Sequence, residues 1–426
     1  MMDLVQRLCQ SLPARFGRVG AWLLLPLAVL GTVVVVECGR IPSLLSATRL
    51  PTPVHFDQGL TAFDPEDVKP WTNVKCGKCH AREFKDWRSS QHAAAGTNEN
   101  FKVEYLYTGG DGRAQQCMNC HAPINPYGHL LPTQEAEGIE QVFKDPPSWL
   151  ADGVDCLSCH LRDGKVLGVH VTSQGLAAHP MRKTPELSTA AFCAGCHQFG
   201  FKTANLPDNY HGQLQQASLA EFLDYRKAGG AEQSCHDCHL NDHRMEGGYT
   251  DSVLKTALEL ELGAVWQPGS RQLEIVVTLT TQNVGHRVPG GELFRFLTLD
   301  TQVTDARGRP LLPRIPSGSG EELAGPEASS RWPKRETMRR RIGEYEHGMK
   351  SKAQPIPDTR LLPDSRRRFV YHVQIADPDV VVPVRVRSEL WYHLLDREKA
   401  REIGHAGDFP LKRLLLTRTV SPDISP

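Results

Sequence analysis

Five copies of one short cysteine motif constrain this chain more than any other feature. Ten of the twelve cysteines fall in the pattern C-x-x-C-H. The copies are Cys76-x-x-Cys79-His80, Cys117-x-x-Cys120-His121, Cys156-x-x-Cys159-His160, Cys193-x-x-Cys196-His197 and Cys235-x-x-Cys238-His239. With 12 Cys and 18 His among 426 residues, a random order would give roughly 0.01 matches. The pattern therefore indicates specific chemistry.

The spacing of the motif suits covalent haem attachment. Two thiols three positions apart add to the two vinyl groups on one edge of a porphyrin, and the next residue, His, lies under the iron. Structural zinc sites, disulfide frameworks and thioredoxin-like pairs also use C-x-x-C, but none of them requires that His. We therefore predict five haem c groups, attached through the ten motif cysteines. The predicted proximal ligands of the irons are His80, His121, His160, His197 and His239.

The motifs begin at residues 76, 117, 156, 193 and 235, a quasi-repeat of about 40 residues. Between residues 60 and 250 there is no long amphipathic helix and no series of strands. Five apolar macrocycles would serve as the core of such a segment. We predict a mainly α-helical and irregular pentahaem domain over residues 70–253.

Two short helices are expected in this domain. One runs from Ala81 to Ser90, with Phe84 and Trp87 on one face. The other covers residues 219–227, begins at a capping box of Ser218 and Glu221, and ends at a Gly pair.

Each iron also needs a sixth ligand or an open position, and His is the expected partner. His92 lies 12 residues beyond His80, which is about 18 Å along a helix. We therefore expect His92 to reach a neighbouring haem. The candidate distal ligands are His92, His129, His179, His243 and His286, with His170 and His211 in reserve. Core filling is the favoured role for Met118, Met181 and Met245.

The pattern changes near residue 254. Alternating apolar residues predict four strands, at residues 273–279, 297–303, 369–375 and 384–392. We predict an antiparallel β-sandwich over residues 254–398 and a C-terminal tail over residues 399–426. The Gly- and Pro-rich loop from Asn283 to Gly291 interrupts this domain. It is either a plain connection or a loop that directs His286 into the haem array, and we favour the second.

The N-terminus predicts export. Arg7, Arg15 and Arg18 precede an uncharged run of 18 residues from Val19 to Val36, which is about the minimum that spans a bilayer. We predict a cytoplasmic basic start and a transmembrane anchor over residues 1–40, then a linker over residues 41–69. The positive flank places the later domains on the periplasmic side. A cleaved signal peptide is the alternative, although no clear cleavage site follows the run.

The first motif, with Glu83, Phe84, Trp87, Ser90 and His92 after it, resembles the opening of the cytochrome c-552/4 (cytochrome c-554-related) multihaem family. The later motifs and the loop at residues 283–291 are similar to elements of multihaem cytochromes, although Gly290 stands where Thr is expected. The resemblance covers about residues 70–300. It implies a periplasmic or outer-surface electron-transfer protein with bis-His haems.

Three functions are compatible with these features. The favoured one is electron transfer between a membrane quinol system and periplasmic or outer-surface cytochromes. The alternative is a multihaem oxidoreductase that acts on a small nitrogen or sulfur compound at one open iron. Ammonia-forming nitrite reductases commonly carry Cys-x-x-Cys-Lys, which is absent here. A structural or assembly module is the third. No catalytic residue is assigned, and the balance of 49 basic and 49 acidic residues gives no indication of nucleic acid.

Overall fold

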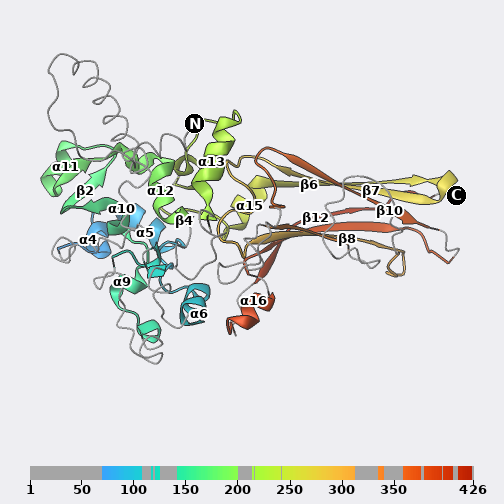
Figure 1. Ribbon diagram of the computed structural model, residues 1–426, viewed down its shortest axis with the longest axis horizontal. Coiled ribbons are helices and arrows are strands. Elements are labelled where there is room, and N and C mark those ends of the chain that lie inside the picture. The colour runs from blue at the N-terminus through green and yellow to red at the C-terminus, as the bar shows by residue number, and fades with distance from the viewer. Residues whose placement is uncertain are drawn as a thin grey trace, which may run out of the picture.

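The computed structural model describes residues 70–107, 117–118, 120–124, 142–199, 214, 216–240, 242–311, 334–339, 358–375, 379–395, 397–405 and 411–424. Two regions lie end to end along the long axis (Figure 1). We call residues 70–257 the motif region and residues 258–424 the β-sandwich region. The predicted anchor and linker lie outside the described residues. None of the helices in the described part of the chain has the length and apolar character of a membrane span.

The motif region consists of short helices joined by loops and very short strands. The helices are α4 (Asn73–Gly77), α5 (Ala81–Arg88), α6 (Glu99–Tyr107), α9 (Ser148–Ala151), α10 (Cys156–His160), α11 (Ser173–Ala178), α12 (Ala190–His197), α13 (Ser218–Lys227), α14 (Cys235–His239) and α15 (Asp251–Ala257). The strands are β1 (Leu161–Arg162), β2 (Lys165–Gly168), β3 (Met181–Lys183), β4 (Gln198–Phe199) and β5 (Gln216–Ala217). Short 3-10 turns lie at Pro185–Ser188 and, between two later strands, at Pro268–Ser270.

Both helices predicted from the sequence are present as α5 and α13, but the predicted capping box is wrong. Ala217 occupies the N-cap of α13, and no side chain caps the helix there. The carboxylate of Glu221 instead accepts hydrogen bonds from Arg360 and from the backbone N–H of Arg287. A tertiary ion pair therefore replaces the local interaction. Gly229, with φ of +93°, follows the end of α13 as expected.

Side-chain packing in the motif region is divided into small clusters. The largest of the described ones joins α6 to the second motif and α9, with Phe101, Tyr105, Met118, Phe143 and Leu150 among its buried residues. Two others hold three buried residues each. The described side chains of this region form no single continuous core.

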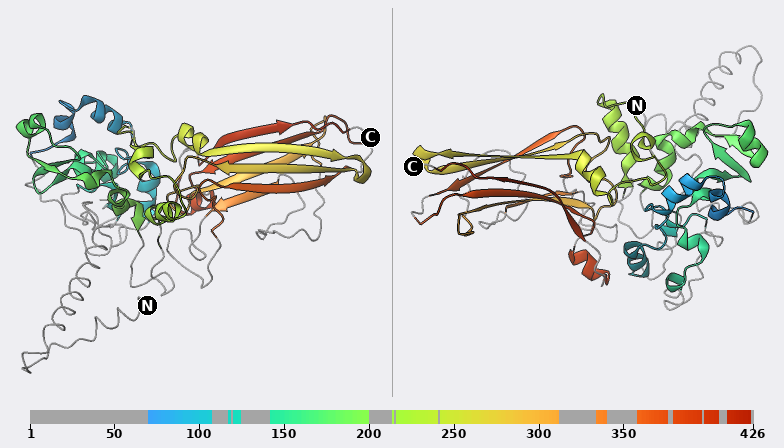
Figure 2. Two further views of the ribbon diagram at one scale, coloured as in Figure 1. Left: turned by 90° about the horizontal axis from the view of Figure 1, so that it is seen from above. Right: turned by 180° about the vertical axis from the view of Figure 1, so that it is seen from behind.

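The β-sandwich region contains two antiparallel sheets, which Figure 2 shows as two layers. One has the order β10-β7-β6, and the other has the order β12-β11-β8-β9. The strands are β6 (Leu258–Gln267), β7 (Gln272–Thr281), β8 (Phe296–Thr304), β9 (Lys334–Arg339), β10 (Arg366–Gln374), β11 (Arg385–His393) and β12 (Lys412–Val420). Alternate residues of β7 are buried along its whole length. Its inner residues pack into one continuous core with those of the other sheet.

The four strands predicted from alternation correspond to β7, β8, β10 and β11. The sandwich is larger than predicted, because β12 lies in the segment assigned as a tail and pairs with β11. Helix α16 (Arg397–Glu402) lies there too. Strand β12 is rich in basic residues and only its Leu415 is fully buried, so its sequence lacks a clear alternation. Strand β6 does alternate Leu with Glu at its start, a signal that the prediction overlooked.

Candidate haem-binding site

The motifs lie in short helices or at helix ends. Helices α10, α12 and α14 all end at the motif His, and α4 runs into the first motif. The second motif is also helical at Cys117 and at Cys120. Residues three positions apart lie on one face of a helix, so the two thiols of a motif are directed the same way.

Buried polar groups connect the first and third motifs. Asp155 caps α10 and exchanges hydrogen bonds with Ser158 in a capping box. Asn73 of α4 accepts from the N–H of Cys156 at 3.2 Å and donates to Asp152 at 2.9 Å. Burial raises the pKa of the Asp155 carboxyl to about 6, although hydrogen bonds from Ser158 oppose this. The two motifs are thereby held at a fixed separation.

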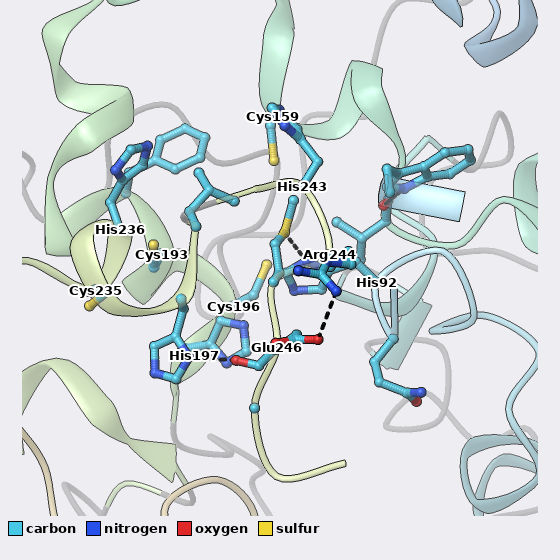
Figure 3. Close-up of a pocket in the computed structure, with 18 of the residues that line it drawn as sticks. His92, Cys159, Cys193, Cys196, His197, Cys235, His236, His243, Arg244 and Glu246 are labelled. Atoms are coloured by element: carbon cyan, nitrogen blue, oxygen red, sulfur yellow. Dashed lines mark hydrogen bonds and ion pairs between the residues drawn. The ribbon is translucent and has the colours of Figure 1, made fainter. Parts of the chain in front are cut away.

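One continuous cavity of about 2060 Å³ runs through the motif region and reaches the end of the sandwich. All ten motif cysteines and all five motif histidines line it. Figure 3 shows part of it, where Cys193, Cys196 and Cys235 surround the same space as His92 and His197. The cavity therefore occupies the position that a side-chain core would fill elsewhere.

Three motif histidines face a second imidazole across this cavity. The ring centres are 6.4 Å apart for His160 and His243, 6.0 Å apart for His197 and His92, and 6.2 Å apart for His239 and His286. An imidazole nitrogen lies about 2 Å from a bound metal and about 1 Å from its own ring centre, so two axial imidazoles stand about 6 Å apart. The observed spacing leaves room for one iron between each pair.

The outer nitrogens of these rings contact neighbouring groups. Nδ1 of His160 lies 2.9 Å from the carbonyl oxygen of Leu167. Nδ1 of His239 lies 2.7 Å from that of Glu246, and Nδ1 of His286 lies 2.9 Å from that of Arg287. The second-motif His121 has the same contact, 2.9 Å from the carbonyl of Ala95. A hydrogen bond at Nδ1 fixes the ring and leaves Nε2 for a metal.

The fourth motif has side-chain partners instead. The amide of Gln216 lies 3.1 Å from His197 Nδ1, and Met245 Sδ lies against His92 Nδ1. Burial, with smaller contributions from neighbouring histidines, lowers the pKa of both His92 and His197 to about 4. Both rings are therefore neutral at pH 7, the state that binds iron. No sequence pattern marked Gln216, which lies in the two-residue strand β5.

The histidines of the first and second motifs differ from the other three in what they face. Among the described residues, no imidazole pairs in this way with His80 or His121. His121 stacks instead on Phe101 of α6, at 4.0 Å between ring centres. His179 lines the same cavity as His80, and its Nδ1 is buried without a hydrogen-bond partner.

His129 and the reserve His211 lie outside the described residues, and the reserve His170 is exposed. Met118 is fully buried in a side-chain cluster, while Met181 lies on β3.

Thiols of different motifs contact each other across the cavity. The neighbouring thiol of Cys156 lowers the pKa of Cys76, that of Cys120 lowers the pKa of Cys196, and that of Cys193 lowers the pKa of Cys235. These contacts join the first motif to the third, the second to the fourth, and the fourth to the fifth. Cys159 of the third motif also interacts electrostatically with Cys196 of the fourth. The fourth motif is thus the neighbour of three others.

The loop that carries His286 is fastened to both regions. Arg360 is 4% exposed and forms an ion pair with Glu221 of α13 and with Asp358. It also donates to the carbonyl of Pro289, 3.1 Å away, inside the loop. We call Arg360, Glu221 and Asp358 the loop latch. Sequence reasoning missed it because its members are far apart in the chain.

Gly290 of this loop lies directly beside the His286 ring. A Cβ atom at this position would lie 2.9 Å from Cε1 of His286. Real Cβ atoms do not approach other atoms this closely, so a larger residue would displace the ring. The departure from the expected Thr therefore has a steric consequence for the histidine in this protein.

The residues present fit five covalent haem groups. Every motif pairs two thiols with an imidazole on a shared cavity, and three motifs face a second imidazole at the separation that one iron requires. Among the described residues, no group of three or more His, Cys, Asp or Glu is arranged to hold a metal ion by itself. The arrangement defines a multihaem cytochrome of the c type.

Comparisons with known proteins agree with a multihaem cytochrome. Residues 75–161 match the family model for cytochrome c554 and c-prime. The fold is similar to the crystal structure of a penta-heme cytochrome c552 from Thermochromatium tepidum, with a TM-score of 0.60 and 19% identity over 82% of this chain and 98% of that one. A search of curated protein sequences finds no significant match. The fold is therefore that of a multihaem c-type cytochrome, and the five motifs on one cavity fit five haem c groups.

Proposed function

We propose that this cytochrome transfers electrons and that most of its irons are six-coordinate. The observation that carries the proposal is the set of three facing imidazole pairs, His160 with His243, His197 with His92, and His239 with His286. Two axial imidazoles fill both axial positions of an iron and leave no place for a substrate. Such an iron exchanges electrons only.

The thiol contacts suggest the order of the haems. The first haem neighbours the third, the third neighbours the fourth, and the fourth neighbours both the second and the fifth. We infer a route through the first, third, fourth and fifth haems, with the second as a branch on the fourth. The protein supplies the fixed separations, and the haems supply the electron carriers.

We assign His179 to the first haem as its sixth ligand. Its ring lies in the same cavity as His80, and its buried Nδ1 makes no hydrogen bond with the described residues. A buried polar nitrogen without a partner is unfavourable, and coordination of this nitrogen to the first iron would satisfy it. His129 stays the predicted ligand of the second haem.

One observation favours the alternative, an oxidoreductase that acts on a small nitrogen or sulfur compound. No described imidazole faces His121, and Phe101 stacks on that ring, so the second haem is the candidate for an open position. Phe101 against the His121 ring would support that ligand from its side. The branch position would let the fourth haem supply or remove electrons.

Carbon monoxide distinguishes the two functions. The reduced spectrum of an electron-transfer protein should not change with carbon monoxide. A shift in one haem would favour the oxidoreductase, and shifts in three or more would refute the paired imidazoles. His92→Ala should add one carbon monoxide-binding haem, because it opens the fourth iron. His170→Ala is the matched control, since this His is exposed and should change nothing.

We also propose that the protein is anchored in a membrane with both described regions on the periplasmic side. The support is the basic start and the apolar run from Val19 to Val36. A membrane quinol system and periplasmic or outer-surface cytochromes are the expected redox partners. The full chain should remain with membranes in high salt and be released by detergent. Release by salt alone would contradict the anchor.

A further inference from the structure

Arg295 lies where the motif region meets the β-sandwich region, immediately before strand β8. Its side chain lines the haem cavity, together with Tyr249 and Tyr392. The guanidinium lies over the Tyr249 ring, 4.8 Å from the ring centre. It donates to the Tyr249 hydroxyl at 3.3 Å and to the Tyr392 hydroxyl at 3.5 Å. Both tyrosine oxygens accept from Arg295, so two hydroxyl groups lie beside the guanidinium.

No carboxylate of the described residues pairs with Arg295. The nearby Arg413 shows the contrast, because it forms an ion pair with Asp251 at 2.9 Å and donates to the carbonyl of Tyr249. A guanidinium carries five N–H donors in a planar fork. The two hydrogen bonds of Arg295 are long and use neutral acceptors. Its charge therefore has no counter-charge from the described protein.

A charge enclosed in this way needs compensation. When haem fills the cavity, Arg295 is separated from bulk water, and an unpaired buried charge costs several kcal/mol. Because Arg295 lines the cavity, a compensating group inside the cavity can reach it. A planar fork with two adjacent hydroxyl groups is suited to an oxyanion with two oxygens.

The position of Arg295 connects it to the second motif. Glu292, three residues earlier, interacts electrostatically with Cys120. Phe294 packs in a cluster that includes Val103 of α6, the helix whose Phe101 stacks on His121. The segment before β8 therefore lies close to the second haem.

We propose that Arg295, Tyr249 and Tyr392 form an oxyanion site in the haem cavity, next to the second haem. The site takes a carboxylate-like group that binds the guanidinium through two oxygens. Two sources could supply this group, a propionate of the bound haem and a small free oxyanion. The inference rests on the five haems and does not depend on whether the protein transfers electrons or catalyses a reaction.

The test uses the full holoprotein and measures the reduction potential of each haem, with and without phosphate. Arg295→Gln removes the charge, and Tyr392→Phe removes one hydroxyl with little change of shape. Arg413→Gln is the matched control, because Arg413 already has its own carboxylate partner and is not part of the cavity wall. Oxidised haem is stabilised when a nearby positive charge is lost, so the potential should fall.

If the source is a propionate, Arg295→Gln shifts the reduction equilibrium of one haem at least tenfold, or about 59 mV for one electron, with or without phosphate. Tyr392→Phe gives a smaller shift of the same haem. If the source is a free oxyanion, phosphate shifts one haem of the wild type in a saturable manner and not that of Arg295→Gln. Either result supports the site. It is overturned if Arg295→Gln matches the wild type in all five potentials and in its phosphate response, or if Arg413→Gln shifts the same haem equally.

Discussion

The β-sandwich region and the motif region fill their interiors with different groups. The β-sandwich region buries its interior with side chains, and many residues of β7, β8 and β11 have no exposed surface. The motif region has small, separate side-chain clusters around one large cavity lined by all five motifs. Its core is the set of haems. Short helices suffice there, because each one needs only to present two thiols and an imidazole.

The difference has a consequence for stability. The sandwich depends on apolar burial, which is available to the bare polypeptide. The motif region gains most of its burial only after the haems are attached. The two regions should therefore respond in opposite ways to loss of haem and to loss of side-chain volume.

Loss of haem should have the largest effect. If the chain is made without haem attachment, the motif region should lose its structure while the sandwich stays folded. Hydrogen exchange would show this as fast exchange over residues 70–253 and protection in β7, β8 and β11. Slow exchange in α10 and α12 without haem would contradict a haem core. Exchange of the attached form in the same buffer is the control.

Breaking the loop latch should have the second largest effect. Arg360→Met leaves the carboxylate of Glu221 buried without its partner, which should cost about 3–5 kcal/mol. Denaturant unfolding would measure this, and the low-spin signal of the fifth haem should weaken as His286 is released. Arg366→Met is the control, because its ion pair with Glu261 is exposed and should contribute at most about 1 kcal/mol. Equal losses in both variants would show that the latch has no special role.

A cavity in the sandwich should destabilise only that region. Leu279 is fully buried in β7, and Leu279→Ala should cost about 2–5 kcal/mol. The haem absorbance spectrum of the native protein should not change. Val276→Ala, on the other face of the same strand, should cost about 1 kcal/mol or less. A changed haem spectrum in Leu279→Ala would show that the two cores are not independent.

The buried Asp155 should give the motif region a pH dependence. Burial raises its pKa from 3.8 to about 6, so the folded state binds a proton that the unfolded state releases. The stability contribution is present below pH 4 and is lost as the pH rises through about 6. The loss should be about 2 to 3 kcal/mol, at about 1.4 kcal/mol per pKa unit.

Comparison with Asp155→Asn isolates this effect. The Asn variant keeps the shape of the helix cap and does not ionise. The difference in unfolding free energy between wild type and variant should therefore change between pH 4 and pH 7. The wild type should be less stable relative to the variant at the higher pH. A difference that stays constant with pH would refute the proposed role of burial.

Much of this architecture was accessible from the sequence, because covalent chemistry and strand alternation leave direct patterns. The motif Cys and His residues are fixed by the spacing of the porphyrin vinyl groups, and β7, β8, β10 and β11 bury alternate residues. Strand β12 was missed since its basic residues mask any alternation. The cap at Ser218 was wrong because Glu221 binds Arg360, a partner that no local pattern reveals.

The pairing of imidazoles was beyond sequence reasoning for a related reason. His92 faces His197, and His160 faces His243, although other motifs lie between them in the chain. Which rings meet depends on how the motif region folds around its haems. The same holds for Arg295, because only the three-dimensional structure shows that no carboxylate of the described residues pairs with it.

The central claim is that five haems are bonded to the ten motif cysteines and form the core of the motif region. Intact mass spectrometry of the mature protein, after treatment with a thiol-alkylating reagent, tests it most directly. Five haem additions with none of the ten cysteines alkylated is the predicted result. Alkylation at Cys76, Cys117, Cys156, Cys193 or Cys235 in the purified protein, with fewer haems attached, would contradict it.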